Sequence, residues 1–142
     1  MEGMNVKMVN QNEPLAYRVR PKSLEEYVGQ EHVIGKGKIL YRTIKADRLS
    51  SIILFGPPGC GKTSLARVIS ETTKYKFYKI NAVSAGVSDI KRVIEETKNF
   101  MLNPAGKSIL FIDEIHRFNK LQQDALLPYV ENGTIILIGA TT

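Results

Sequence analysis

The feature that most constrains this chain is the run at residues 56–63, which fits the G-x-x-x-x-G-K-[ST] pattern of a phosphate-binding loop. It joins an apolar segment, residues 51–55, to a helix-like segment, residues 64–69. Glycine lets a backbone wrap closely around an anion, and the N–H groups and the positive end of the following helix then point inward. The residues expected at the nucleotide are Gly56, Pro57, Pro58, Gly59, Cys60, Gly61, Lys62, Thr63 and Ser64. A Gly/Pro turn that binds nothing is disfavoured, because strand, loop, Lys-Thr and helix are all in register.

Lys62 and Thr63 have separate predicted roles in this loop. Lys62 can reach the β- and γ-phosphates, and Thr63 can place its hydroxyl on Mg²⁺.

Two acids, Asp113 and Glu114, follow the continuous apolar run 109–112. Such a run is typical of a strand buried on both faces, and carboxylates at its end need a partner. We expect Asp113 to hold Mg²⁺ together with Thr63, and Glu114 to polarise the attacking water. Ordinary surface acids are the alternative, and the phosphate loop makes it less favoured. An Asn-Lys-x-Asp run, which a signalling GTPase would show, is missing.

Composition fits one globular domain. The chain has 142 residues, 43% of them hydrophobic, and its start lacks the apolar core of a signal peptide. The one cysteine, Cys60, fits a reducing compartment; it is a redox-sensitive thiol or, as we favour, a small side chain in a permissive position. We expect a cytoplasmic protein, nucleoid-associated if bacterial, with no membrane partner. The net charge of +6 is consistent with a polyanionic partner, although the Lys and Arg residues are scattered.

The order of expected elements predicts an α/β fold. The capping-box pattern at 23–26 is expected to start a short helix. Further helices are expected at about 39–49, 62–74, 88–101 and 121–130, and strands at 51–55, 77–80, 109–112 and 135–138. Strands that alternate with helices give a parallel sheet with helices on both faces, a three-layer sandwich. Ligands bind at the carboxyl ends of such strands. Residues 1–13 are polar and unpatterned and predict a mobile tail.

Several helix and strand ends have local signals. Ser88 is expected to cap a helix with one apolar face, which the proline and glycines of 104–106 would end. Pro128 would kink or end the last helix. Residues 139–142 are expected to be the exit from the fourth strand. The expected apolar face comprises Ile90, Val93, Ile94, Thr97 and Met101.

At this point the sequence resembles a known family. Pro57-Pro58 in the loop, Asp113-Glu114 and the terminal Gly-Ala-Thr-Thr are similar to the AAA+ ATPases. Three further stretches, 14–21, 27–32 and 116–125, resemble the RarA/MgsA group, which is related to the clamp loaders and to the Holliday-junction motor RuvB. The resemblance covers 14–142, taken as a partial AAA+ ATPase domain.

The resemblance implies further site residues, and ATP or ADP with Mg²⁺ as ligands. Thr142 matches the position called sensor 1, although a threonine is also a good strand residue. Asn81 could be a polar switch that turns Glu114 away, or simply a turn residue. His116 and Arg117 could couple nucleotide state to DNA or to a neighbouring subunit; a positioning contact at the loop is slightly favoured. The adenine pocket would be lined by Val19, Arg20, Val28, Gly29 and Gln30.

The resemblance also implies what lies outside the sequence. The family continues with a fifth strand, an arginine finger and a helical lid. We therefore expect a truncated AAA+ core, a bare sheet edge beside the strand at 51–55, and a chain that is inactive or nearly so on its own.

The implied function is the ATP-binding core of a DNA-acting ATPase in replication-fork maintenance, recombination and repair. Expected partners are DNA forks or single-stranded/duplex junctions, accessory proteins such as single-strand binding protein, and further copies of the protein. A protein-remodelling AAA+ ATPase is one alternative, disfavoured because the loop 82–87 has no aromatic residue. A nucleotide-binding interaction module without turnover is another.

Overall fold

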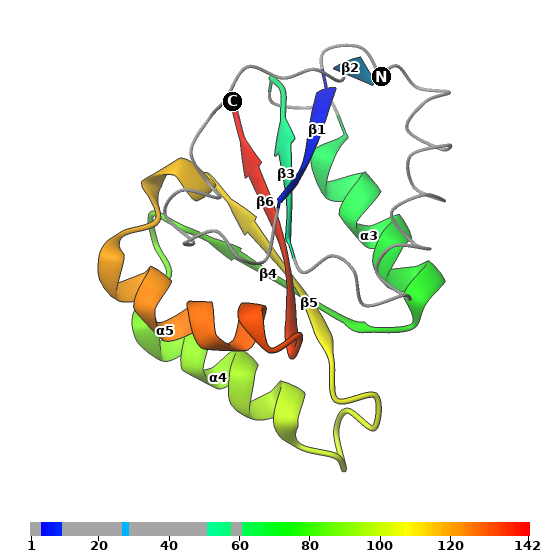
Figure 1. Ribbon diagram of the computed structural model, residues 1–142, viewed down its shortest axis with the longest axis vertical. Helices are drawn as coiled ribbons and strands as arrows, with labels where there is room; N and C mark the ends of the chain where they lie inside the picture. The colour runs from blue at the N-terminus through cyan, green and yellow to red at the C-terminus, as the bar shows by residue number, and fades with distance from the viewer. Residues whose placement is uncertain (1–3, 10–26, 29–50, 58–60) are drawn as a thin grey trace.

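The computed structural model describes residues 4–9, 27–28, 51–57 and 61–142. Its centre is a six-stranded sheet with the order β2-β1-β3-β6-β5-β4 (Figure 1). The strands are β1 (Met4–Val9), β2 (Tyr27–Val28), β3 (Ser51–Phe55), β4 (Lys76–Asn81), β5 (Ser108–Asp113) and β6 (Ile135–Thr141). The helices are α3 (Lys62–Thr73), α4 (Val87–Lys98) and α5 (Lys120–Glu131), and η1 (Ile115–Arg117) is a 3-10 turn. None of the described helices is both long and apolar enough to cross a bilayer.

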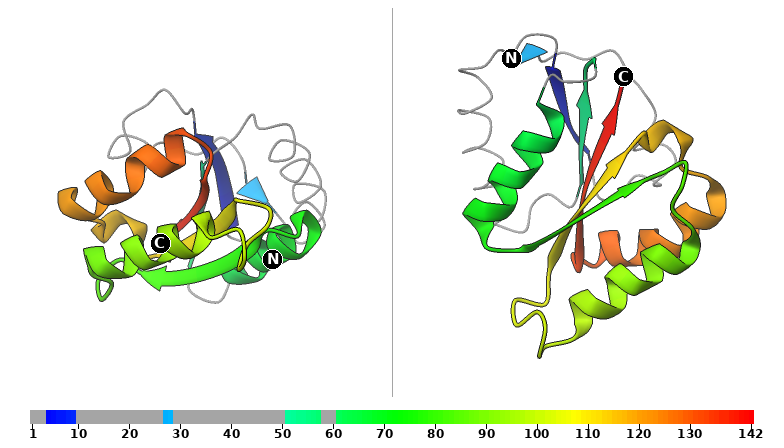
Figure 2. Two further views of the ribbon diagram at one scale, coloured as in Figure 1. Left: turned by 90° about the horizontal axis from the view of Figure 1, so that it is seen from below. Right: turned by 180° about the vertical axis from the view of Figure 1, so that it is seen from behind.

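The sheet is covered on both faces, which confirms the predicted α/β sandwich. β3, β6, β5 and β4 are parallel. Alternate residues of each strand point to opposite faces: Ile52 and Leu54 pack under α3, whereas Ile53 and Phe55 belong to the core under α4 and α5. Figure 2 shows α3 on one side of the sheet and α4 with α5 on the other. Burying a side chain of this kind contributes about 1.5–3 kcal/mol.

The N-terminal segment differs from its prediction. Residues 4–9 are a strand rather than a mobile tail, and β1 pairs antiparallel with β3, from Asn5 opposite Phe55 to Val9 opposite Ser51. The expected bare edge of β3 is therefore occupied. An unpaired edge leaves a row of backbone donors and acceptors open, and residues 4–9, in which Met4, Val6 and Met8 alternate with polar residues, satisfy them.

The ends of α4 also differ from expectation. Gly86, not Ser88, is the N-cap, and its N–H donates to Asp89 Oδ2 at 2.8 Å. The helix ends at Lys98, before the predicted stop at 104–106, and Asn99 Oδ1 accepts the Met101 N–H in a turn. Met101 therefore leaves the apolar face and is 91% exposed. The rest of that face, Ile90, Val93, Ile94 and Thr97, is buried as predicted.

Pro128 does not end α5. The helix continues to Glu131, and the Pro128 carbonyl accepts the Asn132 N–H at 3.0 Å. β6 is longer than the apolar run that predicted it, since Gly139, Ala140 and Thr141 extend the strand instead of forming its exit. Each of the three pairs with a residue of β3.

Candidate functional site

Polar groups that follow β3, β5 and β6 meet in one cleft at the carboxyl edge of the sheet, and Asn81 at the end of β4 is not among its lining residues. The cleft has a volume of about 350 Å³. Its lining comes from the start of α3, the ends of β5 and β6, and the residue that follows β5. The lining residues are Gly61, Lys62, Thr63, Ser64, Phe111, Asp113, Glu114 and Thr142. All but Phe111 were expected at the site from sequence.

The start of α3 is built to receive an anion. Gly61, its N-cap, has φ 95°, a left-handed conformation in which glycine carries no penalty. No side chain caps the helix, and its first turn has no acidic residue. The N–H groups at this end of a twelve-residue helix, together with its dipole, therefore favour a negatively charged ligand.

Lys62 is held at the mouth of the loop by backbone oxygens. Its Nζ donates to Gly56 O at 2.5 Å and to Thr141 O at 3.1 Å. Thr141 O also accepts the Gly56 N–H at 3.1 Å, which joins the beginning of the loop to β6. Backbone oxygens at the ends of two strands thus place the ammonium group in the cleft.

Asp113 and Glu114 are half-buried at the end of β5. Asp113 Oδ1 accepts the Glu114 N–H at 3.0 Å. Glu114 has φ 57° and ψ 41°, a left-handed conformation that costs a residue with a side chain about 1–2 kcal/mol. Strain of this kind gathers at functional sites, where the surrounding structure enforces it. Here the conformation turns the chain sharply, so that the acid lines the cleft instead of continuing the strand.

Packing behind Glu114 enforces this turn. Ile115 is fully buried, and a Cβ added at Gly139 would lie 2.9 Å from Ile115 Cγ1. Only glycine at this position of β6 leaves room for the isoleucine. The Glu114 carbonyl also accepts the Arg117 N–H at 2.9 Å, which closes η1.

Asn81 is the last residue of β4 and lies directly before a turn. Its Oδ1 accepts the Val83 N–H at 2.9 Å, the arrangement of a turn-forming asparagine. Nearby, Gln122 of α5 donates to the Ala82 and Ala85 carbonyls at 2.9 and 2.7 Å and braces the turn. The hydrogen bond recorded for the Asn81 side chain is to this turn, so a switch role toward Glu114 stays a prediction.

Thr142 lines the cleft directly after β6, where the resemblance places sensor 1. The neighbouring residue, Thr141, makes a contact that the sequence analysis did not predict. The Thr141 Oγ1 lies 2.8 Å from His116 Nδ1. His116 Nε2 in turn lies 3.4 Å from Glu114 Oε2. A hydroxyl at the end of an otherwise apolar strand was the available signal, but its partner comes from another strand end.

The remaining predicted residues lie outside the part of the chain that the structure describes. They are Val19, Arg20, Gly29, Gln30, Pro58, Gly59 and Cys60, together with the helices expected before residue 51. For Val28 the structure describes the backbone: Val28 lies in β2 and is paired with Met4 of β1. The adenine pocket therefore stays a prediction.

The donors in the cleft fit a magnesium-bound nucleotide. Mg²⁺ prefers oxygen ligands and is usually held by one or two carboxylates together with substrate phosphates. Asp113 and Thr63 would supply such oxygens, and Lys62 with the α3 N-terminus would meet the phosphates. The described residues contain no group of three or more His, Cys, Asp or Glu that could hold a metal ion by itself. A metal that shares its ligands with a phosphate chain requires no such group.

Comparisons with known proteins identify the family of the chain. Residues 19–142 match the family model described as the Holliday junction DNA helicase RuvB P-loop domain. The chain is 50% identical over 133 residues to replication-associated recombination protein A of Escherichia coli, covering 94% of this chain and 30% of that protein. It is 50% identical over 129 residues to the ATPase WRNIP1 of Dictyostelium discoideum, covering 91% of this chain and 15% of that protein.

A solved structure supports the same assignment. The RuvB Holliday junction branch migration motor of Thermotoga maritima is similar with a TM-score of 0.59 and 31% identity, over 87% of this chain and 42% of that one. The chain thus spans less than half the length of these relatives. The match to the family model and the identity to the recombination proteins place it without ambiguity: the chain belongs to the RuvB P-loop domain family of AAA+ ATPases, and within it to the RarA group.

Proposed function

We propose that the chain is the ATP-binding and ATP-hydrolysing core of a AAA+ ATPase that acts on DNA during replication-fork maintenance, recombination and repair. The observation that carries the proposal is the single cleft in which Lys62, Thr63, Asp113 and Glu114 meet. The α3 N-terminus and Lys62 bind the phosphates, and Thr63 and Asp113 hold Mg²⁺, which supplies charge neutralisation when bound. Glu114 orients the water that attacks the γ-phosphoryl group.

The catalytic power of this arrangement lies in positioning. Phosphoryl transfer to water leaves little covalent chemistry to the protein, so the contributions are alignment and charge stabilisation. The cleft supplies two positive groups for the phosphates and one carboxylate for the water. The arginine finger and the lid implied by the family are not among the described residues, so this chain alone is expected to bind Mg-nucleotide weakly and to turn it over very slowly.

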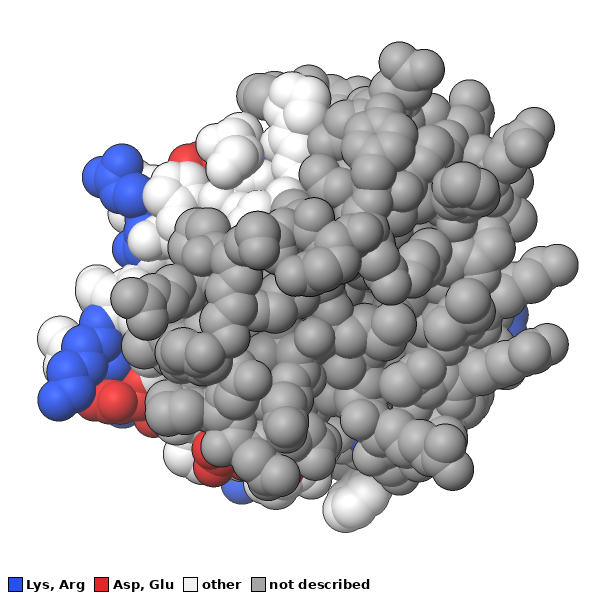
Figure 3. Space-filling model, turned by 45° about the horizontal axis from the view of Figure 1, so that its top comes forward, with Lys and Arg blue, Asp and Glu red and all other residues white. Residues whose placement is uncertain are grey.

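The DNA part of the proposal rests on the relatives. Their names connect them to replication-associated recombination and to Holliday junctions. Forks and single-stranded/duplex junctions are the proposed substrates, and a homo-oligomer with accessory proteins such as single-strand binding protein is the proposed assembly. Figure 3 looks obliquely onto the carboxyl edge, and along one side of this view described Lys and Arg side chains lie beside Asp and Glu side chains. The net charge of +6 is consistent with a polyanionic partner.

Glu114→Gln tests the enzymatic proposal. The amide keeps the shape of the side chain and loses the base, so ATP binding should persist while turnover falls by about 10²–10⁴-fold. Turnover is measured in a protein that carries this chain at the length of its relatives, and binding is measured with a fluorescent ATP analogue. A matched Glu131→Gln change, at the exposed end of α5, should leave both unchanged. Turnover of Glu114→Gln at the unaltered rate would exclude Glu114 as the base.

The DNA proposal has its own test. Binding of a forked DNA by the longer protein should weaken steeply as salt rises, because phosphate contacts release counterions. Affinities are measured by fluorescence anisotropy at several salt concentrations, with the acidic polypeptide polyglutamate as the competitor control. A flat salt response would contradict DNA binding through phosphate contacts.

A further inference from the structure

One contact in the site has no role in the mechanism above. His116 lies on η1 between two groups that come from different strands: Glu114, after β5, and Thr141, at the end of β6. Its Nδ1 is 2.8 Å from Thr141 Oγ1, and its Nε2 is 3.4 Å from Glu114 Oε2. We propose that His116 is a positioning residue, whose imidazole ties the Glu114 carboxylate to Thr141. The proposal rests on the assignment of Glu114 as the base.

The Thr141 end of this link is rigid. Thr141 is 3% exposed and pairs with Phe55 in the middle of the sheet. Its carbonyl is contacted by Lys62 Nζ and by the Gly56 N–H. The hydroxyl that meets His116 is therefore fixed to the strand that also positions the phosphate-binding lysine, and Thr142, which lines the cleft, follows directly.

The Glu114 end, by contrast, has freedom to move. The side chain is 39% exposed, and among the described residues His116 is the partner recorded for its carboxylate. A glutamate has three rotatable side-chain bonds, and an unrestrained carboxylate at this exposure would sample several rotamers. A misplacement of about 1 Å in a catalytic group can cost about 10²-fold in rate. The imidazole removes that freedom by joining the carboxylate to the sheet.

The two contacts differ in kind. His116 Nδ1 and Thr141 Oγ1 are within hydrogen-bond distance at 2.8 Å, whereas Nε2 and Glu114 Oε2, 3.4 Å apart, form an ion-pair contact. A carboxylate accepts only, so the proposal assigns a proton to Nε2, and Nδ1 of that tautomer accepts the Thr141 hydroxyl proton. The opposite tautomer would put a lone pair against the carboxylate.

Imidazole NMR of the chain itself tests the link without nucleotide. Two-bond ¹H–¹⁵N spectra should show His116 with Nε2 protonated, and the signals are assigned by their loss in His116→Gln, since His32 is the other histidine. Thr141→Val should move the Nδ1 resonance, and Glu114→Gln should move the Nε2 resonance. A ring that is protonated at Nδ1 alone would contradict the proposed link. Resonances that do not shift in either variant would contradict it as well.

Turnover in the longer protein tests the positioning role. His116→Asn keeps a polar group near the Nδ1 position and His116→Gln near the Nε2 position, so each retains one end of the link. If the bridge matters, His116→Asn, His116→Gln and Thr141→Val should each lower kcat by about 10-fold with KM unchanged, and His116→Asn combined with Thr141→Val should cost no more than either alone. Thr141→Ser, which keeps the hydroxyl, should retain kcat near that of the unaltered protein.

The controls separate this role from a structural one and from the proposed function. Thr134→Val makes the same change just before the other end of β6 and should leave kcat unchanged. Additive losses, or a rise in KM that accounts for the loss, would refute the bridge. If Glu114→Gln abolishes turnover while the His116 variants keep full kcat, the positioning role fails and the proposed function stands. If Glu114→Gln keeps full turnover, the base assignment fails, whatever the NMR contacts show.

Discussion

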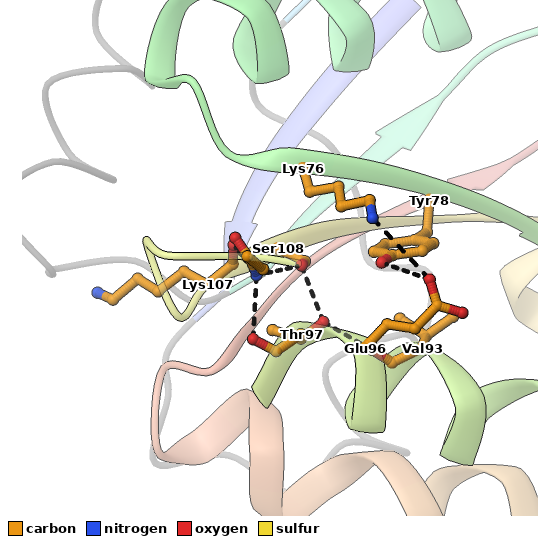
Figure 4. A network of polar contacts seen from close by, with 8 residues as sticks. Lys76, Tyr78, Val93, Glu96, Thr97, Lys107 and Ser108 are labelled. Carbon is orange, nitrogen blue, oxygen red and sulfur yellow. Dashed lines mark hydrogen bonds and ion pairs between the residues drawn. The ribbon is translucent and has the colours of Figure 1, made fainter. Parts of the chain in front are cut away.

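At the amino end of β5, the polar side chains of Thr97, Asn103 and Ser108 are buried and bonded to one another, whereas at the carboxyl edge of the sheet polar side chains are half-exposed and incompletely paired. Thr97 and Ser108 are fully buried, with their hydroxyl oxygens 2.8 Å apart (Figure 4). Asn103, 4% exposed, donates to Thr97 O at 3.0 Å and to Lys107 O at 3.1 Å. At the carboxyl edge, Lys62, Asp113 and Glu114 all keep contact with solvent.

The buried, paired side chains serve stability, and the half-exposed ones serve function. A buried polar group costs free energy unless it is paired, so the satisfied hydrogen bonds of Asn103 fix the conformation of the loop before β5. Farther along β4 lies Tyr78, whose hydroxyl donates to Glu96 at 3.0 Å and whose pKa is raised, mainly by burial. At the carboxyl edge the unpaired capacity is left for a ligand. Substitutions in the two regions should therefore affect different measurements.

The largest effect is expected for Lys62→Ala. The phosphates lose their main cation, and affinity for Mg-ATP should fall by about 10²-fold or more, since hydrogen bonds to charged groups are each worth about 1.5–3 kcal/mol. The free energy of unfolding should change by less than about 1 kcal/mol, because the side chain is only partly buried. Isothermal titration calorimetry and urea unfolding measure the two quantities. Lys79→Ala, an exposed lysine of β4, is the matched control; affinity of Lys62→Ala within about threefold of normal would contradict the phosphate role.

Asn103→Ala should show the reverse pattern. It removes the donor to two backbone carbonyls and leaves buried acceptors without a partner, which should lower the free energy of unfolding by about 2–4 kcal/mol. Mg-ATP affinity, measured below the unfolding transition, should stay unchanged. Asn132→Ala removes an exposed asparagine that accepts the Thr134 N–H and should cost less than about 1 kcal/mol. A loss of affinity in Asn103→Ala would show that the two regions are coupled.

Sequence reasoning located the carboxyl edge better than the details around it. The phosphate loop and Asp113-Glu114 are contiguous signals, and the continuous apolar runs that precede them are long enough to identify buried strands. The topology rule for parallel sheets then brought their ends together. These inferences needed only local pattern and one general rule of chain connection.

The errors came where a tertiary contact outweighs local pattern. Residues 4–9 are the exception, because their local pattern was overlooked: Met4, Val6 and Met8 alternate with polar residues, as in a half-buried strand, and the segment pairs with β3. Ser88 had the better capping side chain, yet Gly86 and Asp89 begin α4. The link from His116 to Thr141 joins residues 25 positions apart through the packing of two strand ends, and no spacing rule predicts it.

The smallest expected effect comes from Gly139→Ala. This single substitution should change both the free energy of unfolding and the turnover of ATP. The added Cβ would lie 2.9 Å from Ile115 Cγ1 and 3.0 Å from Ile53 Cδ1, so the core must shift, at a cost of about 1–3 kcal/mol in the free energy of unfolding. Ile115 directly follows Glu114, so its displacement should also lower turnover while Mg-ATP affinity stays near normal.

A double-mutant cycle with Ile115→Ala identifies the cause. Ile115→Ala removes the atom that the new methyl group meets first, so the double variant should lose less stability than the sum of the single variants. Urea unfolding of the four proteins gives the coupling energy, and steady-state turnover in the longer protein gives the effect on the site. Losses that add without coupling would mean that Gly139 does not act through Ile115. The left-handed turn at Glu114 would then be held by η1 alone, and the packing of β6 would serve stability without reaching the catalytic edge.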